Sequence, residues 1–275
     1  MSEFSDRPDF WSGTPAEEDV TVPAAVTALA GGRAAVPVWA NEVGGITFDV
    51  GAGAERCFIK WVPAGSGLDL EAEADRMQWA GRFHPVPRPL ARGRDEAGSW
   101  LVTAPVPGQN AVTERWRADP ATAVTAIGEG LWALHEALPV AGCPFSWSAG
   151  ERLAAARRAA AEGQLSSAGW HPVHHGLTIA AALERAAAIP PTDKLVVCHG
   201  DACAPNTILA GDGRWSGHVD LGDLGTADRW ADLAVATWSA DWNYGPGWDR
   251  LLLDAYGVKP DPERIRYYRL LWDLG

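Results

Sequence analysis

Three oxygen-bearing side chains lie close together in the sequence, in otherwise apolar surroundings. Asp201 is followed by Asn206, and Asp220 begins the tripeptide Asp-Leu-Gly. A carboxylate can receive the proton of a hydroxyl group, whereas a second carboxylate and an amide oxygen are hard ligands for a divalent metal. Phosphate transfer from a nucleoside triphosphate needs such a metal, because the phosphates carry several negative charges. The three residues therefore predict phosphoryl transfer to a hydroxyl.

The spacing of these residues sharpens that prediction. Asp201 and Asn206 are as far apart as the Asp and Asn of a kinase catalytic loop, and Asp220 takes the place of the metal-binding Asp-x-Gly. Each residue by itself is also explained as a turn residue, since Asp and Asn favour turns. The three together favour Asp201 as the catalytic residue, with Asn206 and Asp220 as ligands of Mg²⁺.

A lysine suited to contact the phosphates lies in an earlier predicted strand. Alternation along residues 57–62 places Lys60 on the same face as Phe58, where an ammonium group needs an anionic partner. Glu71 and Glu73 on the following predicted helix are the candidates. The competing interpretation is a solvated lysine on an edge strand.

A second contribution to phosphate binding is predicted from Gly44 and Gly45, which precede the strand expected at 46–50. Glycine has no Cβ atom, so its backbone N–H group can approach a phosphate closely. A Gly-Gly pair is also common in plain turns. The sequence leaves both interpretations open.

Two lobes are predicted to position these residues, with the nucleotide-binding lobe at 1–104 and the catalytic and acceptor-binding lobe at 105–275. Short β-like runs dominate the first lobe, and one helix is expected among them. Pro105, Pro107 and Gly108 mark the hinge between the lobes. The expected strands of the first lobe are 46–50, 57–62 and 99–103, and its helix is 69–82.

The second lobe is predicted to be mostly helical, with one hairpin inside it. Asp119-Pro120 supplies an N-cap and a proline at the first helical position, followed by an amphipathic stripe that ends at Leu138. The turn residues at 211–213 favour a hairpin of strands 207–209 and 215–219, which Asn206 and Asp220 flank. Further helices are expected at 151–161, 177–188, 229–239 and 247–256 and from 261 to the C-terminus, with a buried run at 195–198.

The composition excludes several classes of protein. A chain of 275 residues, 47% hydrophobic and 21% charged, is an ordinary globular mixture. The net charge of −12 disfavours nucleic acid and anionic membranes, leaving small and particularly cationic molecules as partners. The first residues do not form a signal peptide and no apolar stretch is long enough to span a membrane, so we expect a cytoplasmic location. Monomer and dimer are both compatible with the sequence.

The cysteines do not indicate a disulfide framework or a zinc site. Only four are present, they are scattered along the chain, and none form a Cys-x-x-Cys pair. We therefore expect reduced, structural thiols at Cys57, Cys143, Cys198 and Cys203.

The stretch from His199 to Ala234, HGDACAPNTILAGDGRWSGHVDLGDLGTADRWADLA, closely resembles the aminoglycoside 3′-phosphotransferase family and its streptomycin 3″-phosphotransferase relatives. The resemblance covers nearly the whole chain. It implies an α+β, two-lobed protein-kinase-like fold, MgATP as the donor, and a hydroxyl of an aminocyclitol antibiotic as the acceptor. It also implies antibiotic resistance as a role. The motifs outside this stretch are FIKW, LEAEADRMQWAGRFHPVP, SWLVTAPVPG, CPF and RIRYYRLLWDLG.

The resemblance assigns a role to each candidate catalytic and binding residue named above. Asp201 matches the catalytic aspartate that orients the acceptor hydroxyl, and Asn206 and Asp220 match the metal ligands. Lys60 matches the lysine that contacts the α and β phosphates. Alignment through the following DRMQW makes Glu73 its partner, in preference to the earlier glutamate of the helix.

The predicted acceptor site departs from the family pattern. Polycationic aminoglycosides are held by many carboxylates, because each ammonium needs a charge-assisted acceptor. The family places an acidic cluster where this chain has residues 168–175, with imidazoles and a tryptophan, and it commonly has arginine where this chain has Asp223. The tail keeps one acid and the terminal carboxylate. The acceptor-binding candidates are Asp223, Trp272, Asp273 and Gly275.

Tryptophans and histidines near this site have two interpretations each. Trp238, Trp242 and Trp248 can stack on sugar rings or hold a cation, or they can pack in the core. A histidine pair such as His171 and His175 is able to bind zinc on a helix, but the proline at 172 disfavours a regular helix. We expect a solvated or substrate-contacting loop there.

The function predicted from the sequence is ATP-dependent phosphorylation of a 3′ or 3″ hydroxyl of an aminoglycoside. One alternative is a kinase for another amino sugar, sugar or natural product, which the missing acids favour. A second is a nucleotide-binding pseudokinase, which the intact Lys60, Asp201, Asn206 and Asp220 disfavour. A zinc hydrolase built on the histidine loop is a distant third.

Overall fold

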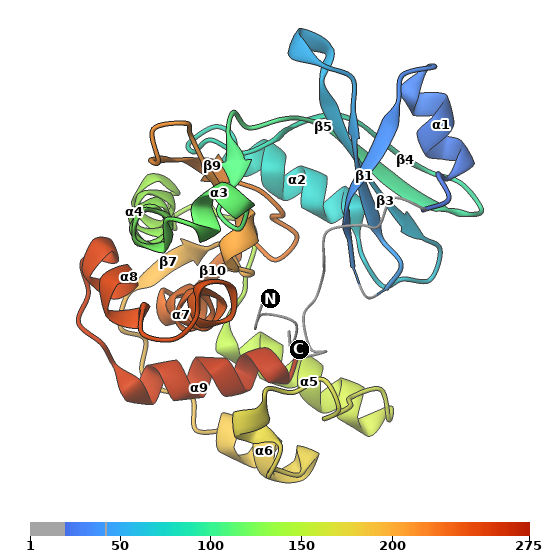
Figure 1. The fold of residues 1–275 in the computed structure, drawn as a ribbon. Coiled ribbons are helices and arrows are strands. Elements are labelled where there is room, and N and C mark those ends of the chain that lie inside the picture. The colour runs from blue at the N-terminus through green and yellow to red at the C-terminus, as the bar shows by residue number, and fades with distance from the viewer. Residues whose placement is uncertain (1–19, 42) are drawn as a thin grey trace, which may run out of the picture. The chain divides into compact units, whose positions relative to one another are not determined.

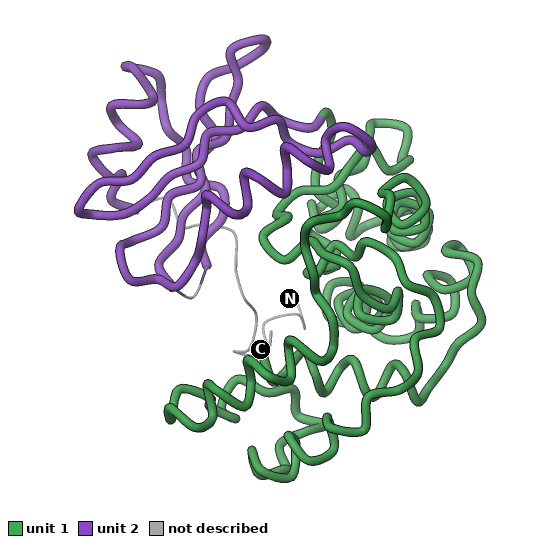
Figure 2. Tube along the Cα trace, turned by 180° about the vertical axis from the view of Figure 1, so that it is seen from behind, with its two compact units in different colours: residues 1–10, 107–275 green, residues 11–106 purple. Residues whose placement is uncertain are grey.

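The computed structural model describes residues 20–41 and 43–275 (Figure 1). The chain divides into two compact units (Figure 2). The first in sequence reaches Val106 and is purple, with the key label unit 2; the second begins at Pro107 and is green, with the key label unit 1. The predicted division lies between residues 104 and 105. No helix within the described ranges is long and apolar enough to cross a membrane.

The first unit is built on a five-stranded antiparallel sheet with the order β1-β2-β3-β5-β4. The predicted strands are confirmed as β2 (Ile46–Val50), β3 (Cys57–Pro63) and β5 (Gly98–Ala104). The predicted helix is confirmed as α2 (Leu70–Ala80), which Asp69 caps by accepting the backbone N–H of Ala72 at 3.0 Å. The sequence analysis missed β1 (Ala35–Ala40), β4 (Arg88–Arg94) and α1 (Ala24–Ala30).

One physical reason explains why the sequence analysis missed both β1 and β4. Both lie at an edge of the sheet, where an unpaired side of the strand tolerates proline. Pro37 lies in β1 and Pro89 in β4, and the pairing register shifts next to each of them. Proline at such a position therefore does not exclude an edge strand.

Helices cover the two faces of this sheet (Figure 1). On one face, Val26 of α1 packs with Phe48, Ile59 and Val102, which are buried. On the other, α2 packs against β4 and β5. Alternation along β3 directs Lys60 away from the face that Ile59 occupies.

The second unit is mostly helical, and its predicted elements are confirmed. Asp119 caps α4 by accepting the backbone N–H of Thr122, with Pro120 as the first helical residue. The helices are α3 (Glu114–Arg117), α4 (Pro120–Ala137), α5 (Ala149–Ala161), α6 (Ile179–Ala186), α7 (Trp230–Tyr244), α8 (Asp249–Tyr256) and α9 (Pro262–Asp273). The strands are β6 (Gln109–Asn110), β7 (Leu195–Cys198), β8 (Thr207–Leu209), β9 (Trp215–His218) and β10 (Gly225–Asp228).

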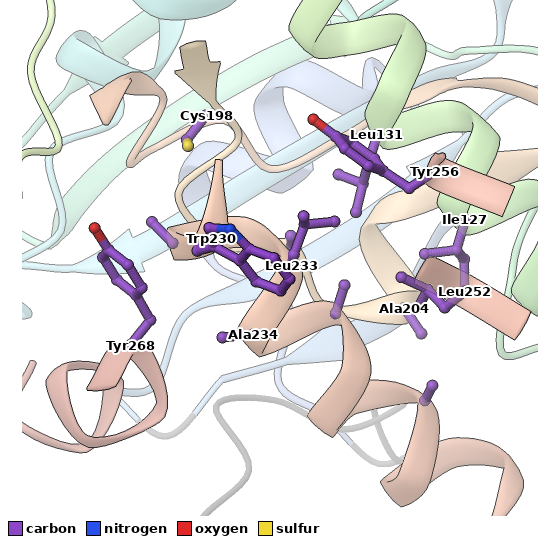
Figure 3. Close-up of a cluster of buried hydrophobic side chains, with 14 of the residues drawn as sticks. Ile127, Leu131, Cys198, Ala204, Trp230, Leu233, Ala234, Leu252, Tyr256 and Tyr268 are labelled. Atoms are coloured by element: carbon purple, nitrogen blue, oxygen red, sulfur yellow. The ribbon is translucent and has the colours of Figure 1, made fainter. Parts of the chain in front are cut away.

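Helix α7 is the centre of this unit. It runs to Tyr244, beyond the predicted end at 239, and it is buried on nearly every side. Trp230 and Leu233 belong to the same buried cluster as Leu131 of α4 and Tyr256 of α8 (Figure 3). A helix that is buried on all sides has no polar face, so its sequence lacks the amphipathic pattern from which the length of a helix is predicted. This explains why residues 240–244 were not predicted to be helical.

All four cysteines are free, which confirms that prediction. Cys57, Cys198 and Cys203 are buried and Cys143 is partly exposed. Burial raises the pKa of the Cys198 and Cys203 thiols well above the ordinary value.

Candidate active site

The hairpin of β8 and β9 brings Asn206 and Asp220 to the same end. Thr207 pairs with His218, so the residue before β8 and the residues after β9 are neighbours. The backbone N–H of Val219 donates to the carbonyl of Asn206 at 2.9 Å. Two segments separated by a turn therefore present an amide and a carboxylate together.

A second pair of strands brings the Asp201 loop to the same place. β7 and β10 pair antiparallel, with Cys198 opposite Gly225, so residues 199–201 lie beside 222–224. Gly200 has φ of +89°, and a Cβ atom there would lie 2.3 Å from the carbonyl oxygen of Asp223. Only glycine permits this approach of the two backbones.

Asp201 is held by Asn206 and leaves one oxygen free. The Asn206 amide donates to the Asp201 carbonyl and to its Oδ2, both at 2.9 Å. Oδ1 of Asp201 is buried and accepts no hydrogen bond. Burial and the nearby Asp220 carboxylate raise the pKa of the Asp201 carboxyl above its usual value, while Cys203 and Asn206 oppose that rise. Oδ1 is therefore able to accept a hydrogen bond from a donor such as a hydroxyl.

Asp220 adopts a backbone conformation that side chains rarely take. Its φ is +63°, and it is the one residue other than glycine with a positive φ in the described ranges. Such a conformation costs energy and persists where the surroundings impose it, often at functional sites. Here Asp220 lies two residues after the end of β9, the strand that pairs with β8.

The donor set fits a Mg²⁺ ion. Because the Asn206 nitrogen is used by Asp201, its amide oxygen is left to ligate, and Asp220 adds carboxylate oxygens. Mg²⁺ prefers hard oxygen ligands of this kind and takes few of them from the protein.

A buried aspartate of α7, Asp232, holds the catalytic loop. Its carboxylate accepts the backbone N–H groups of His199 at 2.6 Å and Gly200 at 3.0 Å, and it accepts from Nε2 of His135 at 2.9 Å. Nδ1 of His135 lies 2.8 Å from the Tyr256 hydroxyl. Burial alone would raise the pKa of Asp232, yet the hydrogen bond and charge of His135, with His199 nearby, lower it below its usual value.

The sequence analysis did not single out Asp232, although a signal was available. An acid among the apolar residues of 230–236 has to be buried and therefore has to be paired. With His135 and Cys198 it also forms a group of three potential metal ligands whose atoms lie within 4.8 Å of one another. The hydrogen bonds to His135, His199 and Gly200 already account for this carboxylate.

Both ring nitrogens of His199 form hydrogen bonds with the backbone. Nε2 donates to the carbonyl of Val219 at 2.9 Å, and Nδ1 accepts the N–H of Asp201 at 3.2 Å. The imidazole thereby ties the Asp201 loop to the end of β9, which is a structural role.

In the first unit, Lys60 forms an ion pair with Glu73. Its Nζ lies 2.9 Å from Oε2 and 3.2 Å from Oε1, and the two side chains are 20% and 4% exposed. Glu71, the other candidate, pairs instead with Arg92. The glutamate is buried, so its carboxylate orients the Lys60 ammonium through a charge-assisted hydrogen bond.

The amides of Gly44 and Gly45 are engaged within their own turn. The N–H of Gly44 donates to the carbonyl of Asn41 at 3.2 Å, and that of Gly45 donates to Oδ1 of Asn41 at 2.6 Å. A Cβ atom at Gly45 would lie 2.9 Å from Val62, so a close turn explains this glycine. Phosphate binding by these amides stays a prediction, and it requires the exchange of these hydrogen bonds.

The acceptor candidates are spread over two places. Oδ2 of Asp273 accepts from the backbone N–H of His171 at 3.1 Å and from Nδ1 of His174 at 2.5 Å, so this acid holds the histidine loop. Asp223 packs against Gly200 of the catalytic loop. Trp272 is partly buried and Gly275 is exposed at the end of α9.

The histidines at 171–175 have separate protein partners and no regular helix. His174 contacts Asp273, and Nε2 of His175 donates to the carbonyl of Trp170 at 2.7 Å. Nδ1 of His171 accepts the N–H of Val173 within a single 3₁₀ turn, Pro172–His174. This arrangement gives the zinc alternative no support.

A buried cation that the sequence did not indicate lies near the C-terminus. Arg152 of α5 is 4% exposed, donates to the carbonyl of Leu271 at 3.2 Å and lies over the ring of Trp147. Burial lowers its pKa to about 10, while the charge of Asp223 opposes that fall. Neither α5 nor its neighbours carry a pattern that predicts this placement.

Comparison with known proteins places this chain in a family. The sequence model of the phosphotransferase enzyme family, APH, matches residues 45–268. An aminoglycoside 3′-phosphotransferase of Streptomyces fradiae is 41% identical over 226 residues, covering 76% of this chain and 81% of the relative. A streptomycin 3″-kinase of Streptomyces griseus is 38% identical over 258 residues, covering 84% and 88%.

A solved structure agrees with these relatives. The aminoglycoside phosphotransferase APH(3″)-Id of Streptomyces rimosus, in complex with ADP and streptomycin, superposes with a TM-score of 0.68 at 32% identity. The alignment covers 83% of this chain and 90% of that one. The fold and these relatives define a phosphotransferase of the protein-kinase-like class. The chain belongs to the APH phosphotransferase enzyme family.

Proposed function

We propose that this protein transfers the γ-phosphate of ATP to a 3′ or 3″ hydroxyl of an aminoglycoside, with Mg²⁺ as the metal. The observation that carries the chemistry is the buried Oδ1 of Asp201, which has no donor although Oδ2 is fixed by Asn206. A hydroxyl of the acceptor supplies that missing donor. The acceptor class rests on relatives that are aminoglycoside and streptomycin kinases.

In the proposed reaction, Asp201 orients the acceptor hydroxyl and receives its proton. The hydroxyl oxygen forms a bond to the γ-phosphorus, the bond from that phosphorus to the β–γ bridging oxygen breaks, and ADP leaves. Asn206 and Asp220 would hold Mg²⁺, which offsets the negative charge on the phosphates. Lys60, oriented by Glu73, contacts the α and β phosphates.

The alternatives are less well supported. A pseudokinase would not need Asp201 held with one oxygen free beside Asn206. A kinase for another sugar has the same phosphoryl-transfer residues, so only the acceptor separates it from the proposed enzyme. Nothing in the described part of the chain gives the histidine loop a metal-binding geometry.

The test of this proposal is ADP release in a coupled assay. MgATP is supplied with kanamycin, neomycin, streptomycin, glucosamine or glucose, and the Asp201→Asn protein is the background. Release that depends on one of the three aminoglycosides is the expected result. Release only with a simple sugar, or none with any acceptor, would refute the proposed acceptor class.

Removal of divalent metal is expected to lower aminoglycoside-dependent ADP release by about 100-fold or more, because the phosphate charge is then unscreened. The measurement adds excess chelator to the same assay, and excess Mg²⁺ restores the rate. A rate that persists in chelator would contradict the roles proposed for Asn206 and Asp220.

Replacing Lys60 by methionine is expected to lower kcat/KM for ATP by about 100-fold, the typical cost of one preorganised cationic donor. Methionine keeps the length of the side chain, so the sheet should fold as before. Lys259→Met, at an exposed position outside the sheet, is the matched control. Equal kinetics for the two variants would show that Lys60 does not contact the nucleotide.

A further inference from the structure

Two cations reach helix α2 from one row of the five-stranded sheet. Lys60 of β3 and Arg92 of β4 both pair with Leu101 of β5, one from each side. Residues directly opposite one another in antiparallel strands point to the same face. Both side chains therefore leave the sheet on the face against which α2 packs. Lys60 has a role in the proposed reaction, whereas none has been assigned to Arg92.

Arg92 contacts α2 at three points. Its Nε lies 2.9 Å from Oε2 of Glu71, and its Nη1 lies 2.6 Å from Oδ1 of Asp75. Nη1 also donates to the backbone carbonyl of Glu71 at 3.1 Å. A guanidinium group is planar and rigid, so bonds in several directions fix the helix relative to β4 more closely than a flexible ammonium would.

The acids that the two cations bind lie on different sides of the helix. Glu71 and Asp75 are four residues apart and share one face, whereas Glu73, midway between them, points to the opposite face. The Glu73 side chain is 4% exposed, and those of Glu71 and Asp75 are 58% and 55% exposed. A rotation of α2 that withdraws Glu73 from Lys60 would therefore also break the contacts with Arg92.

The contacts of Arg92 are better suited to position α2 than to stabilise the fold. The Arg92 side chain is 39% exposed, and ion pairs at such exposure contribute little to the free energy of unfolding. The orientation of a phosphate-binding lysine is more sensitive, because the lysine–glutamate pair of a kinase must be in place for catalysis. A small displacement of Glu73 would leave the fold intact but move the Lys60 ammonium.

We propose that Arg92 is a positioning residue for nucleotide binding, which holds the outer face of α2 and so fixes Glu73 and, through it, the ammonium of Lys60. This inference rests on the proposed function, since it requires that Lys60 contacts the phosphates of ATP. Arg92 acts through the helix and is not itself a catalytic residue. Its effect falls on the nucleotide, so the KM for the acceptor should change less than about twofold.

Replacing Arg92 by methionine tests this role, because it removes the guanidinium group and keeps an unbranched side chain. The affinity for MgATP, measured by calorimetry without acceptor, is expected to fall by about 3- to 10-fold, the range that one or two exposed ion pairs allow. Arg92→Lys retains a single charged donor and should give an intermediate affinity. The control is Arg94→Met, which removes an exposed arginine from the same strand and should leave the affinity unchanged.

A second variant removes the same ion pairs from the side of the helix. Glu71→Gln combined with Asp75→Asn keeps the shapes of both side chains and removes both charges. It should weaken MgATP binding about as much as Arg92→Met does. Unchanged affinity in this double variant would contradict a role for the ion pairs of Arg92 in holding α2.

A double-mutant cycle separates positioning from a general structural effect. In a Lys60→Met background, Arg92→Met is expected to cause no further loss of MgATP affinity, because the ammonium that it positions is absent. Equal fold losses in both backgrounds, or an Arg92→Met protein that binds MgATP like Arg94→Met, would overturn the proposal. If MgATP binds but no aminoglycoside is phosphorylated, the proposed acceptor class fails, and the same titrations still decide the role of Arg92. Absence of MgATP binding in the unmodified protein would refute both.

Discussion

Replacing Asp201 by asparagine is expected to lower kcat by about 10³-fold, within the range that a positioned acid or base contributes. The asparagine side chain has the same shape, but it cannot receive a proton from the acceptor hydroxyl. The affinity for MgATP should stay within a few-fold, because the proposed metal ligands are Asn206 and Asp220. The measurements are ADP release under saturating substrates and nucleotide binding by calorimetry.

The matched control for this variant is Asp212→Asn. Asp212 lies in the exposed turn between β8 and β9 and pairs with Arg214. The Asp212→Asn variant therefore loses the same charge as Asp201→Asn, at a position outside the site. Its kcat should equal that of the original protein. An Asp201→Asn protein that retains kcat within a few-fold would refute the catalytic role of Asp201.

Replacing Asp232 by alanine is expected to lower the free energy of unfolding by about 3–5 kcal/mol, the cost of breaking a buried charged pair. The carboxylate is fully buried and accepts from His135 and from the backbone N–H groups of His199 and Gly200. Without it, three buried donors lose their partner, and the Asp201 loop loses its support. Urea denaturation measures the loss.

A milder variant and a control keep this prediction testable if the alanine protein does not fold. Asp232→Asn retains one acceptor oxygen and should lose less stability than alanine, yet it should still lower kcat through the displaced loop. The control is Asp254→Asn, because the exposed Asp254 carboxylate forms an ion pair with the exposed Arg250. This variant should change the free energy of unfolding by less than about 0.5 kcal/mol. Equal stability of the Asp232 and Asp254 variants would contradict the proposed support.

The pH dependence of stability follows from the same residue. The pKa of Asp232 is lower in the folded protein than its ordinary value, so the folded state is favoured above the unfolded-state pKa of about 3.9. This stabilisation is lost as the pH falls through the folded-state pKa. The urea midpoint of the original protein should therefore fall more steeply below pH 4 than that of Asp232→Asn.

Local sequence patterns were enough to predict the elements that carry the chemistry. The turn at 211–213 defines the hairpin, and Asn206 and Asp220 flank it, so their proximity follows from short-range pairing alone. The Asp119-Pro120 start of α4 and strand β3 with Lys60 are equally local. Interactions between residues close in sequence leave their signature in the order of residue types.

Only the tertiary structure showed which side chains Asp273 contacts and which residues support the loop of Asp201. Asp273 meets His174 across 99 positions of sequence, and His135 meets Asp232 across 97. The edge strands β1 and β4 likewise depend on what packs, or fails to pack, against them. These features come from long-range contacts, and a residue's type alone does not specify which distant side chain satisfies it, because many partners meet the same need for burial and hydrogen bonding.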